Sequence, residues 1–224
     1  MSIIPARGGS KGIPKKNLAI LNKKPLLHYT INASVKSNLI DRTVVSTDDK
    51  EIADFAKKYD VQIIKRPKKL SSDNVGLEPV IDHVLKFLER NDKYVPDVIV
   101  LLQNTSPLRN MNHVNEALKL FQKMKFDSLL SGFVSHKFLW KSKNSCVFPV
   151  NYNPKKRLRR QKISDQFIEN GAIYITKKQS FKKNKCRISG DIGMYIMPEE
   201  LSIEIDNEYE LTFAENILKM INHE

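Results

Sequence analysis

The sequence predicts a doubly wound α/β fold with a mostly parallel sheet and a small inserted lobe. Short apolar runs alternate with segments whose apolar residues have helical spacing, and the run at 98–102 is uninterrupted. A strand that is apolar at every position is buried on both faces, as in the centre of a parallel sheet. The length of 224 residues suffices for one such domain, and we expect 1–224 to form it.

The first half of the chain shows the alternation most clearly. Pro25 precedes a helical pattern and is favourable in a first turn. Asp48, with Glu51 three residues later, has the spacing of a capping box and predicts a helix start. We expect strands at 3–4, 42–46, 61–64 and 98–102 and helices at 26–35, 48–58, 76–88 and 113–124.

The alternation of strands and helices ends after a further expected strand at 128–134. From about 136 to 169 there is one Trp, a pair of prolines and a basic cluster, without a helical or strand period. Strands are expected again at 172–176, 193–197 and 202–205, and a last amphipathic helix at 208–221. We interpret 136–169 as an inserted lobe.

A glycine-rich, basic segment follows the first strand. Residues 6–12 read Ala-Arg-Gly-Gly-Ser-Lys-Gly, and glycine permits the concave turn in which backbone N–H groups approach an oxyanion. Arg7, Lys11, Lys15 and Lys16 add positive charge. The spacing matches neither the P-loop nor the dinucleotide fingerprint. The pattern favours phosphate binding at the carboxyl edge of the sheet, and the alternative is a surface turn with solvated charges.

This segment, with Lys16-Asn17 after it, resembles the A-R-x-G-S-K-x-x-x-x-K-N signature of the acylneuraminate cytidylyltransferases. The segment 101–109, L-L-Q-N-T-S-P-L-R, resembles L-L-Q-P-T-S-P-L-R of that family, with Asn104 in place of proline. Arg160-Gln161 and Asn170-Gly171-Ala172-Ile173-Tyr174 resemble its R-Q and N-G-A-I-Y motifs. The resemblance implies a nucleotide-diphospho-sugar transferase-like fold and a homodimer in which the lobe reaches over a second subunit.

The resemblance also implies an activity. It is the formation of a CMP-sugar from CTP and a nine-carbon 2-keto sugar acid, a nonulosonic acid, with release of pyrophosphate. Arg7 and Lys16 would be catalytic, Asn17 would reach the nucleoside and Arg66 the cytosine carbonyl. The residues implied to bind CTP are Arg7, Gly8, Ser10, Lys11, Lys16, Asn17 and Arg66. Asp73 ends a segment that resembles the L-x-x-D turn of the family, and it has a second reading as a helix cap.

For the sugar acid, the resemblance implies Gln103, Arg160, Asn170 and, as a weaker candidate, Lys137. The planar fork of an arginine suits a carboxylate, and Arg160 is the candidate for that contact, donated across the dimer. Ser106 and Arg109 are expected to shape the turn after Gln103.

Glu204 and Asp206 lie two residues apart on the expected last strand, which would put both carboxylates on one face. Neighbouring carboxylates repel each other unless a cation lies between them, which favours Mg²⁺. The family motif is I-D-I-D, so Glu204 is a departure with a longer arm, and Asp206 is also implied to be catalytic. The alternative for Asp206 is the start of the last helix.

Composition narrows the function classes. The net charge of +13 fits a polyanionic substrate, nucleic acid or a solvated lysine-rich surface, and we favour the last reading for most of it. The rival functions are a CMP-Kdo synthetase and a noncatalytic RNA-binding protein, but we expect no nucleic-acid partner. No apolar run reaches about 18 residues, so we expect no membrane partner. Cys146 and Cys186 have no metal-ligand spacing, and we expect a cytoplasmic protein.

Overall fold

The computed structural model describes residues 1–163 and 166–221, apart from the side chain of Arg160. Its centre is a 7-stranded sheet in the order β11-β7-β10-β6-β1-β4-β5. Every neighbouring pair is parallel except those of β10, which runs antiparallel to β6 and β7. The strands are β1 (Ser2–Pro5), β4 (Thr43–Thr47), β5 (Gln62–Lys65), β6 (Val98–Leu101), β7 (Ser128–Val134), β10 (Phe167–Lys177) and β11 (Ile192–Ile196). The predicted fold class is confirmed.

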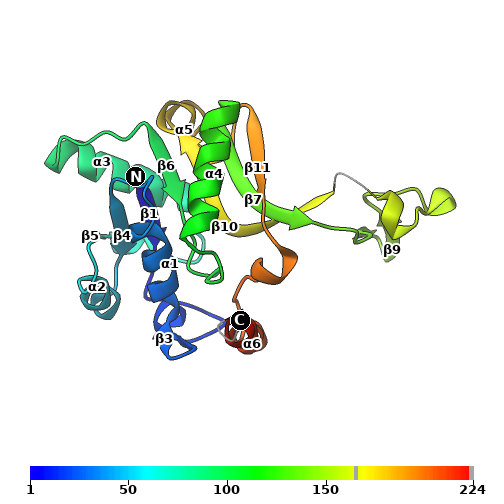
Figure 1. The fold of residues 1–224 in the computed structure, drawn as a ribbon, viewed down its shortest axis with the longest axis horizontal. Helices are drawn as coiled ribbons and strands as arrows, with labels where there is room; N and C mark the ends of the chain where they lie inside the picture. The colour runs from blue at the N-terminus through cyan, green and yellow to red at the C-terminus, as the bar shows by residue number, and fades with distance from the viewer. Residues whose placement is uncertain (164–165, 222–224) are drawn as a thin grey trace.

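Helices cover both faces of the sheet (Figure 1). Successive strand residues point to opposite faces, so Ile4 and Ile3 belong to two different apolar clusters. The helices on the Ile4 face are α1 (Leu26–Val35), α2 (Lys50–Ala56) and α4 (Met111–Met124), and those on the Ile3 face are α3 (Leu77–Asn91) and α5 (Lys178–Asn184). Within the described ranges, no helix is both long enough and apolar enough to span a membrane.

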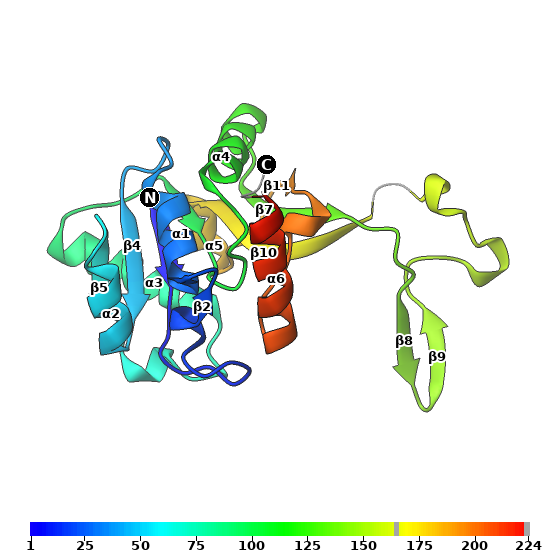
Figure 2. The same ribbon diagram turned by 60° about the horizontal axis from the view of Figure 1, so that its bottom comes forward.

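The last helix, α6 (Glu208–Ile221), packs against the N-terminal part of the chain (Figure 2). There it meets the small hairpin of β2 (Ile20–Leu21) and β3 (Lys24–Pro25). A third apolar cluster fills this contact and contains Ile13, Leu21, Leu26, Leu108, Ile205 and Ala214. Residues far apart in the sequence, the N-terminal loop and 201–206, are thereby brought side by side.

An arm leaves the body of the molecule between β7 and β10 (Figures 1 and 2). It carries a hairpin of β8 (Trp140–Lys143) and β9 (Cys146–Pro149) where the sequence had no readable period. Asn144 and Ser145 connect the strands and have φ values of 48° and 64°. Two successive positive φ values are typical of a type I′ turn, which usually signals itself by Asn-Gly. The sequence Asn144-Ser145 does not match that pattern, so it did not indicate a hairpin.

The capping box predicted at Asp48 is wrong by one residue. The N-cap of α2 is Asp49, whose carboxylate accepts a hydrogen bond from the backbone N–H of Ile52 at 2.9 Å. Asp48 instead accepts from the backbone N–H of Gly8 at 3.1 Å. The carboxylate of Asp48 is therefore used to hold the N-terminal loop, and the helix starts later and ends earlier than predicted.

The strand predicted at 202–205 is also wrong. This segment follows a 3₁₀ turn at Glu199–Leu201 and joins no sheet in the part of the chain that the structure describes. The backbone N–H of Ile205 donates to the carbonyl of Thr105 at 2.7 Å, and the side chain of Ile205 is buried in the third cluster. Packing against the turn at 103–109, and not strand pairing, therefore positions Glu204 and Asp206.

Candidate functional site

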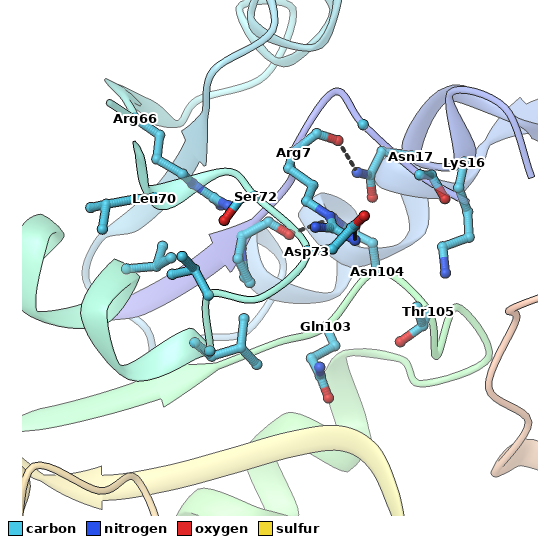
Figure 3. Close-up of a pocket in the computed structure, with 17 residues that line it drawn as sticks. Arg7, Lys16, Asn17, Arg66, Leu70, Ser72, Asp73, Gln103, Asn104 and Thr105 are labelled. Atoms are coloured by element: carbon cyan, nitrogen blue, oxygen red, sulfur yellow. Dashed lines mark hydrogen bonds and ion pairs between the residues drawn. The ribbon is translucent and has the colours of Figure 1, made fainter. Parts of the chain in front are cut away.

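A cavity of about 270 Å³ lies at the carboxyl ends of β1, β5 and β6 (Figure 3). This is the edge at which open α/β sheets bind ligands. The expected site residues that line the cavity are Arg7, Ser10, Lys16, Asn17, Arg66 and Gln103. Three different strand ends thus contribute to one cavity.

The loop after β1 is fixed by its own neighbours. Asn17 donates from Nδ2 to the carbonyl of Arg7 at 2.8 Å, and Gly8 donates its N–H to Asp48. A Cβ atom at Gly12 would overlap the carbonyl oxygen of Asp206. Gly8 was expected to face a phosphate, but Asp48 already accepts from its N–H, and Gly8 does not line the cavity.

The cationic side chains of this loop are paired with carboxylates. Arg7 Nη2 lies 2.7 Å from Asp73 Oδ1, and Lys11 Nζ lies 3.0 Å from Asp73 Oδ2. Lys16 Nζ lies 2.7 Å from Asp206 Oδ1. Asp73 does not cap α3, because the N-cap residue of that helix is Gly76. Sequence reasoning missed this role of Asp73, although the L-x-x-D likeness marked the position.

Arg66 is the most deeply enclosed cation of the cavity. Its side chain donates from Nη2 to the carbonyl of Ser46 at 2.8 Å and from Nε to Ser46 Oγ at 3.3 Å. Burial lowers the pKa of Arg66 to about 10, while the charge of Asp48 opposes this shift and that of Arg7 adds to it. Arg66 therefore stays charged at neutral pH in a fixed orientation.

The turn after β6 is held from behind by Arg109. This wholly buried guanidinium donates from Nη2 to the carbonyl of Gln103 at 2.7 Å and to Thr30 Oγ1 at 2.8 Å. Asn104, where the family has proline, donates from Nδ2 to the carbonyl of Pro5 at 3.1 Å. That bond ties the ends of β1 and β6 together and is one that a proline side chain cannot make. Arg109 and Asn104 position Gln103.

A family model described as "Cytidylyltransferase" matches residues 1–222. The chain belongs to the cytidylyltransferase family. It is 35% identical over 218 residues to N-acylneuraminate cytidylyltransferase A of Danio rerio, covering 96% of this chain and 49% of that protein. It is 32% identical over 231 residues to N-acylneuraminate cytidylyltransferase of Escherichia coli O18:K1:H7, covering 100% of this chain and 53% of that protein. The chain spans about half the length of these curated relatives.

Solved structures agree on the fold of this chain. CMP:2-keto-3-deoxy-manno-octonic acid synthetase, complexed with CTP, superposes with a TM-score of 0.70 at 14% identity, covering 98% of both chains. A 4-diphosphocytidyl-2C-methyl-D-erythritol synthase from Anaerococcus prevotii superposes with a TM-score of 0.68 at 13% identity, covering 97% of both. At such low identity these likenesses show the fold alone.

Two carboxylates lie next to residues that line the cavity: Asp206 pairs with Lys16, and Glu204 lies near Gln103. Glu204 is exposed as a whole, but its carboxylate lies against Gly171, and Gln103 approaches the same glycine. This local burial raises the pKa of Glu204, and the charge of Asp206 raises it further. Gly171 has a φ of 65°, and a Cβ atom there would overlap Glu204. A close backbone approach that only glycine allows thus seats Glu204 beside Gln103.

Of the remaining sugar-acid candidates, the structure places Asn170 and Lys137 away from the cavity. Asn170 is in the interior, where its Nδ2 donates to Ser202 Oγ at 2.9 Å and its Oδ1 accepts from Ser131 Oγ at 2.6 Å. Those bonds occupy its amide, so Asn170 supports the segment that carries Glu204 instead of facing the cavity. Lys137 is exposed on the arm, and the side chain of Arg160 lies outside the described part of the chain.

Proposed function

We propose that this chain transfers the cytidylyl group of CTP to a nonulosonic acid and releases pyrophosphate. The observation that carries the proposal is a single cavity lined by Arg7, Lys16 and Arg66 in a member of the cytidylyltransferase family. Several fixed cations in one concave site favour a polyanion such as a nucleoside triphosphate. The sugar acid is proposed because curated relatives are named N-acylneuraminate cytidylyltransferases.

In the proposed reaction the anomeric hydroxyl oxygen of the sugar acid attacks the α-phosphorus of CTP. A new phosphorus–oxygen bond forms as the bond to pyrophosphate breaks, so no covalent enzyme intermediate is needed. Arg7, Ser10 and Lys11 would hold phosphate oxygens, while Lys16 would offset the charge that develops at the transferred phosphorus. Asn17 would reach the nucleoside, Arg66 the cytosine carbonyl and Gln103 the sugar acid.

Glu204 and Asp206 would hold the Mg²⁺ ion that we propose as the cofactor. Within the described ranges, no three His, Cys, Asp or Glu side chains converge as metal ligands. Mg²⁺ usually takes only one or two carboxylates and completes its shell with phosphate oxygens and water, so this pair of oxygen donors fits it. The raised pKa of Glu204 beside Asp206 marks two carboxylates that a cation would stabilise. When bound, the ion would offset the charge of the phosphates.

We further propose that the lobe at 136–169 mediates a homodimer. The arm projects from the body and exposes apolar side chains that would ordinarily be buried, namely Leu139, Trp140, Val147, Phe148, Val150 and Leu158. Large exposed apolar side chains concentrated on one projecting arm favour contact with another protein surface. In such a dimer, Arg160 and Lys137 would reach the sugar acid in the site of the other subunit.

Cys146 and Cys186 are unpaired, which supports the proposed cytoplasmic location.

The decisive experiment measures pyrophosphate release with Mg²⁺ and CTP against a panel of nonulosonic acids and Kdo, with ATP, GTP and UTP as controls. We expect release with CTP and a nine-carbon acid and none with the other nucleotides. Release only with Kdo would replace the proposed substrate. Silence across the panel combined with salt-sensitive binding of RNA would instead support the noncatalytic alternative.

A further inference from the structure

One carboxylate, that of Asp73, occupies two of the cations that the proposed function assigns to phosphate. Its two oxygens divide between them, with Oδ1 at 2.7 Å from Arg7 Nη2 and Oδ2 at 3.0 Å from Lys11 Nζ. Figure 3 shows the Asp73 carboxylate directed at the guanidinium of Arg7 inside the cavity. A carboxylate that bridges two cations presents its oxygens much as a phosphate group would.

Nothing else in the described structure accounts for Asp73. It lies in the loop between the 3₁₀ turn at Lys68–Leu70 and α3, and it leaves the capping of α3 to Gly76. The hydrogen bond from Lys11, with the nearby charge of Arg7, lowers the pKa of Asp73, so the group is an anion at neutral pH. Its side chain is 39% exposed, so water and a competing anion reach it readily.

The other paired lysines of the loop differ from this arrangement. Lys15 pairs with Glu51, and neither residue lines the cavity. Lys16 pairs with Asp206, which the proposed function assigns to the metal. Asp73 alone among these carboxylates lines the cavity and pairs with two cations assigned to phosphate.

We propose that Asp73 is a positioning residue that competes with pyrophosphate for Arg7 and Lys11 and thereby favours release of this product. The inference rests on the proposed function. With phosphate absent, Asp73 holds the two cations in place near the cavity. When phosphate binds, its larger charge displaces the carboxylate, and when pyrophosphate leaves, Asp73 returns. The same competition weakens the binding of CTP. Asp73 therefore lowers the affinity for the substrate while it speeds the release of pyrophosphate.

The test is calorimetric binding of inorganic pyrophosphate, without metal, to the wild type and to Asp73→Asn. Asparagine keeps the shape of the side chain and removes its charge. Because exposed ion pairs are individually weak, we expect the Kd of pyrophosphate to fall about two- to tenfold. Glu51→Gln is the matched control: it removes one negative charge near the same loop but outside the cavity, and it should leave the Kd unchanged. Asp73→Glu, which keeps the charge, should resemble the wild type more closely than Asp73→Asn does.

A second readout follows from the same competition. In the forward reaction, the inhibition constant of pyrophosphate should fall in Asp73→Asn by the same factor as its Kd. A Kd that is unchanged or higher in Asp73→Asn, in a protein with a wild-type unfolding midpoint, would overturn the inference. If the wild type binds CTP and pyrophosphate but the variant shows no gain, only the inference fails. If the wild type binds neither, the inference fails together with the proposed function.

Discussion

Lys15 and Lys16 are adjacent in the sequence but have different surroundings. Lys16 lines the cavity and is only 17% exposed, whereas Lys15 has a φ of 49°, is 61% exposed and pairs with Glu51. The left-handed conformation of Lys15 turns the chain between the two side chains. Replacing each lysine in turn therefore separates the effect of a positive charge in this loop from the effect of a positive charge inside the cavity.

We predict that Lys16→Ala lowers kcat about 100- to 1,000-fold, because in the proposed reaction it removes a preorganised charge beside the transferred phosphorus. Lys15→Ala should stay within about twofold of the wild type, because an exposed ion pair contributes little. Steady-state kinetics with saturating CTP measure both. Equal losses in the two variants would contradict the assignment of Lys16.

Gly171 and Gly9 differ in the space available for a side chain. Gly171 has a φ of 65° and no space for a Cβ atom beside Glu204, whereas nothing lies within 4 Å of a Cβ atom built at Gly9. We predict that Gly171→Ala lowers the free energy of unfolding by about 1–3 kcal/mol, through backbone strain and displacement of neighbours.

Urea denaturation measures this difference, and Gly9→Ala is the control, expected to change stability by less than about 1 kcal/mol. A Gly171→Ala protein as stable as Gly9→Ala would mean that the contact with Glu204 is loose. In that case the proposed seating of Glu204 beside Gln103 would be wrong.

At the scale of elements, the start of α4 contains a titratable capping box. Asn110 Oδ1 accepts from the backbone N–H of His113 at 3.2 Å, and His113 Nδ1 accepts from the backbone N–H of Asn110 at 3.2 Å. An imidazole nitrogen can accept only when it is unprotonated. Burial lowers the pKa of His113 below its usual 6.5, with Glu116 opposing the shift and Arg109 adding to it.

The sign of the pH effect follows from that lowered pKa. The folded protein favours neutral His113, so its contribution to stability is complete above the usual pKa and is lost as the pH falls through the lowered one. We predict that the wild type loses about 1 kcal/mol more than His113→Gln between about pH 7.5 and pH 5, because glutamine keeps the acceptor without titrating. Urea denaturation at the two pH values measures this, and parallel losses would contradict it.

At the scale of the whole molecule, the arm is the feature that one copy of the chain does not explain. Among the residues that the structure describes, its strands β8 and β9 pair only with each other, and Trp140 and Phe148 are 49% and 53% exposed. An isolated two-stranded hairpin is marginally stable in water. Burial against a second subunit would stabilise it, by about 25 cal/mol for each Å² of apolar surface covered.

We predict that Trp140→Glu combined with Phe148→Glu produces a folded monomer, because it places two charges in the proposed contact. Sedimentation velocity should show a dimer for the wild type and a monomer for the variant, with unchanged circular dichroism. Val95→Glu, an equally exposed apolar position away from the arm, is the control and should remain dimeric. A monomeric wild type would refute the proposed dimer.

The sequence by itself determined the layered fold and six of the side chains that line the cavity, namely Arg7, Ser10, Lys16, Asn17, Arg66 and Gln103. Period and apolar runs predicted most strands and helices of the body, because each is decided locally by which face of the element is buried. They missed α5 and wrongly placed a strand at 202–205. The resemblance to the family motifs implied Arg7, Lys16, Arg66 and Gln103. Three of these, Arg7, Arg66 and Gln103, lie within two residues of the ends of β1, β5 and β6, which meet at one edge of the sheet. These predictions required no knowledge of which side chains pair.

Only the tertiary structure decided which groups the polar side chains of the site bind. Asp48 holds Gly8 and not a helix, Asp73 holds two cations, and Asn170 is buried in the interior. Each of these side chains has more than one acceptable local partner, and the choice depends on residues that are distant in the sequence. The same holds for 202–206, whose conformation is decided by packing on the turn at 103–109 and on the N-terminal loop. Long-range contacts have no period, so no pattern within the segment could reveal them.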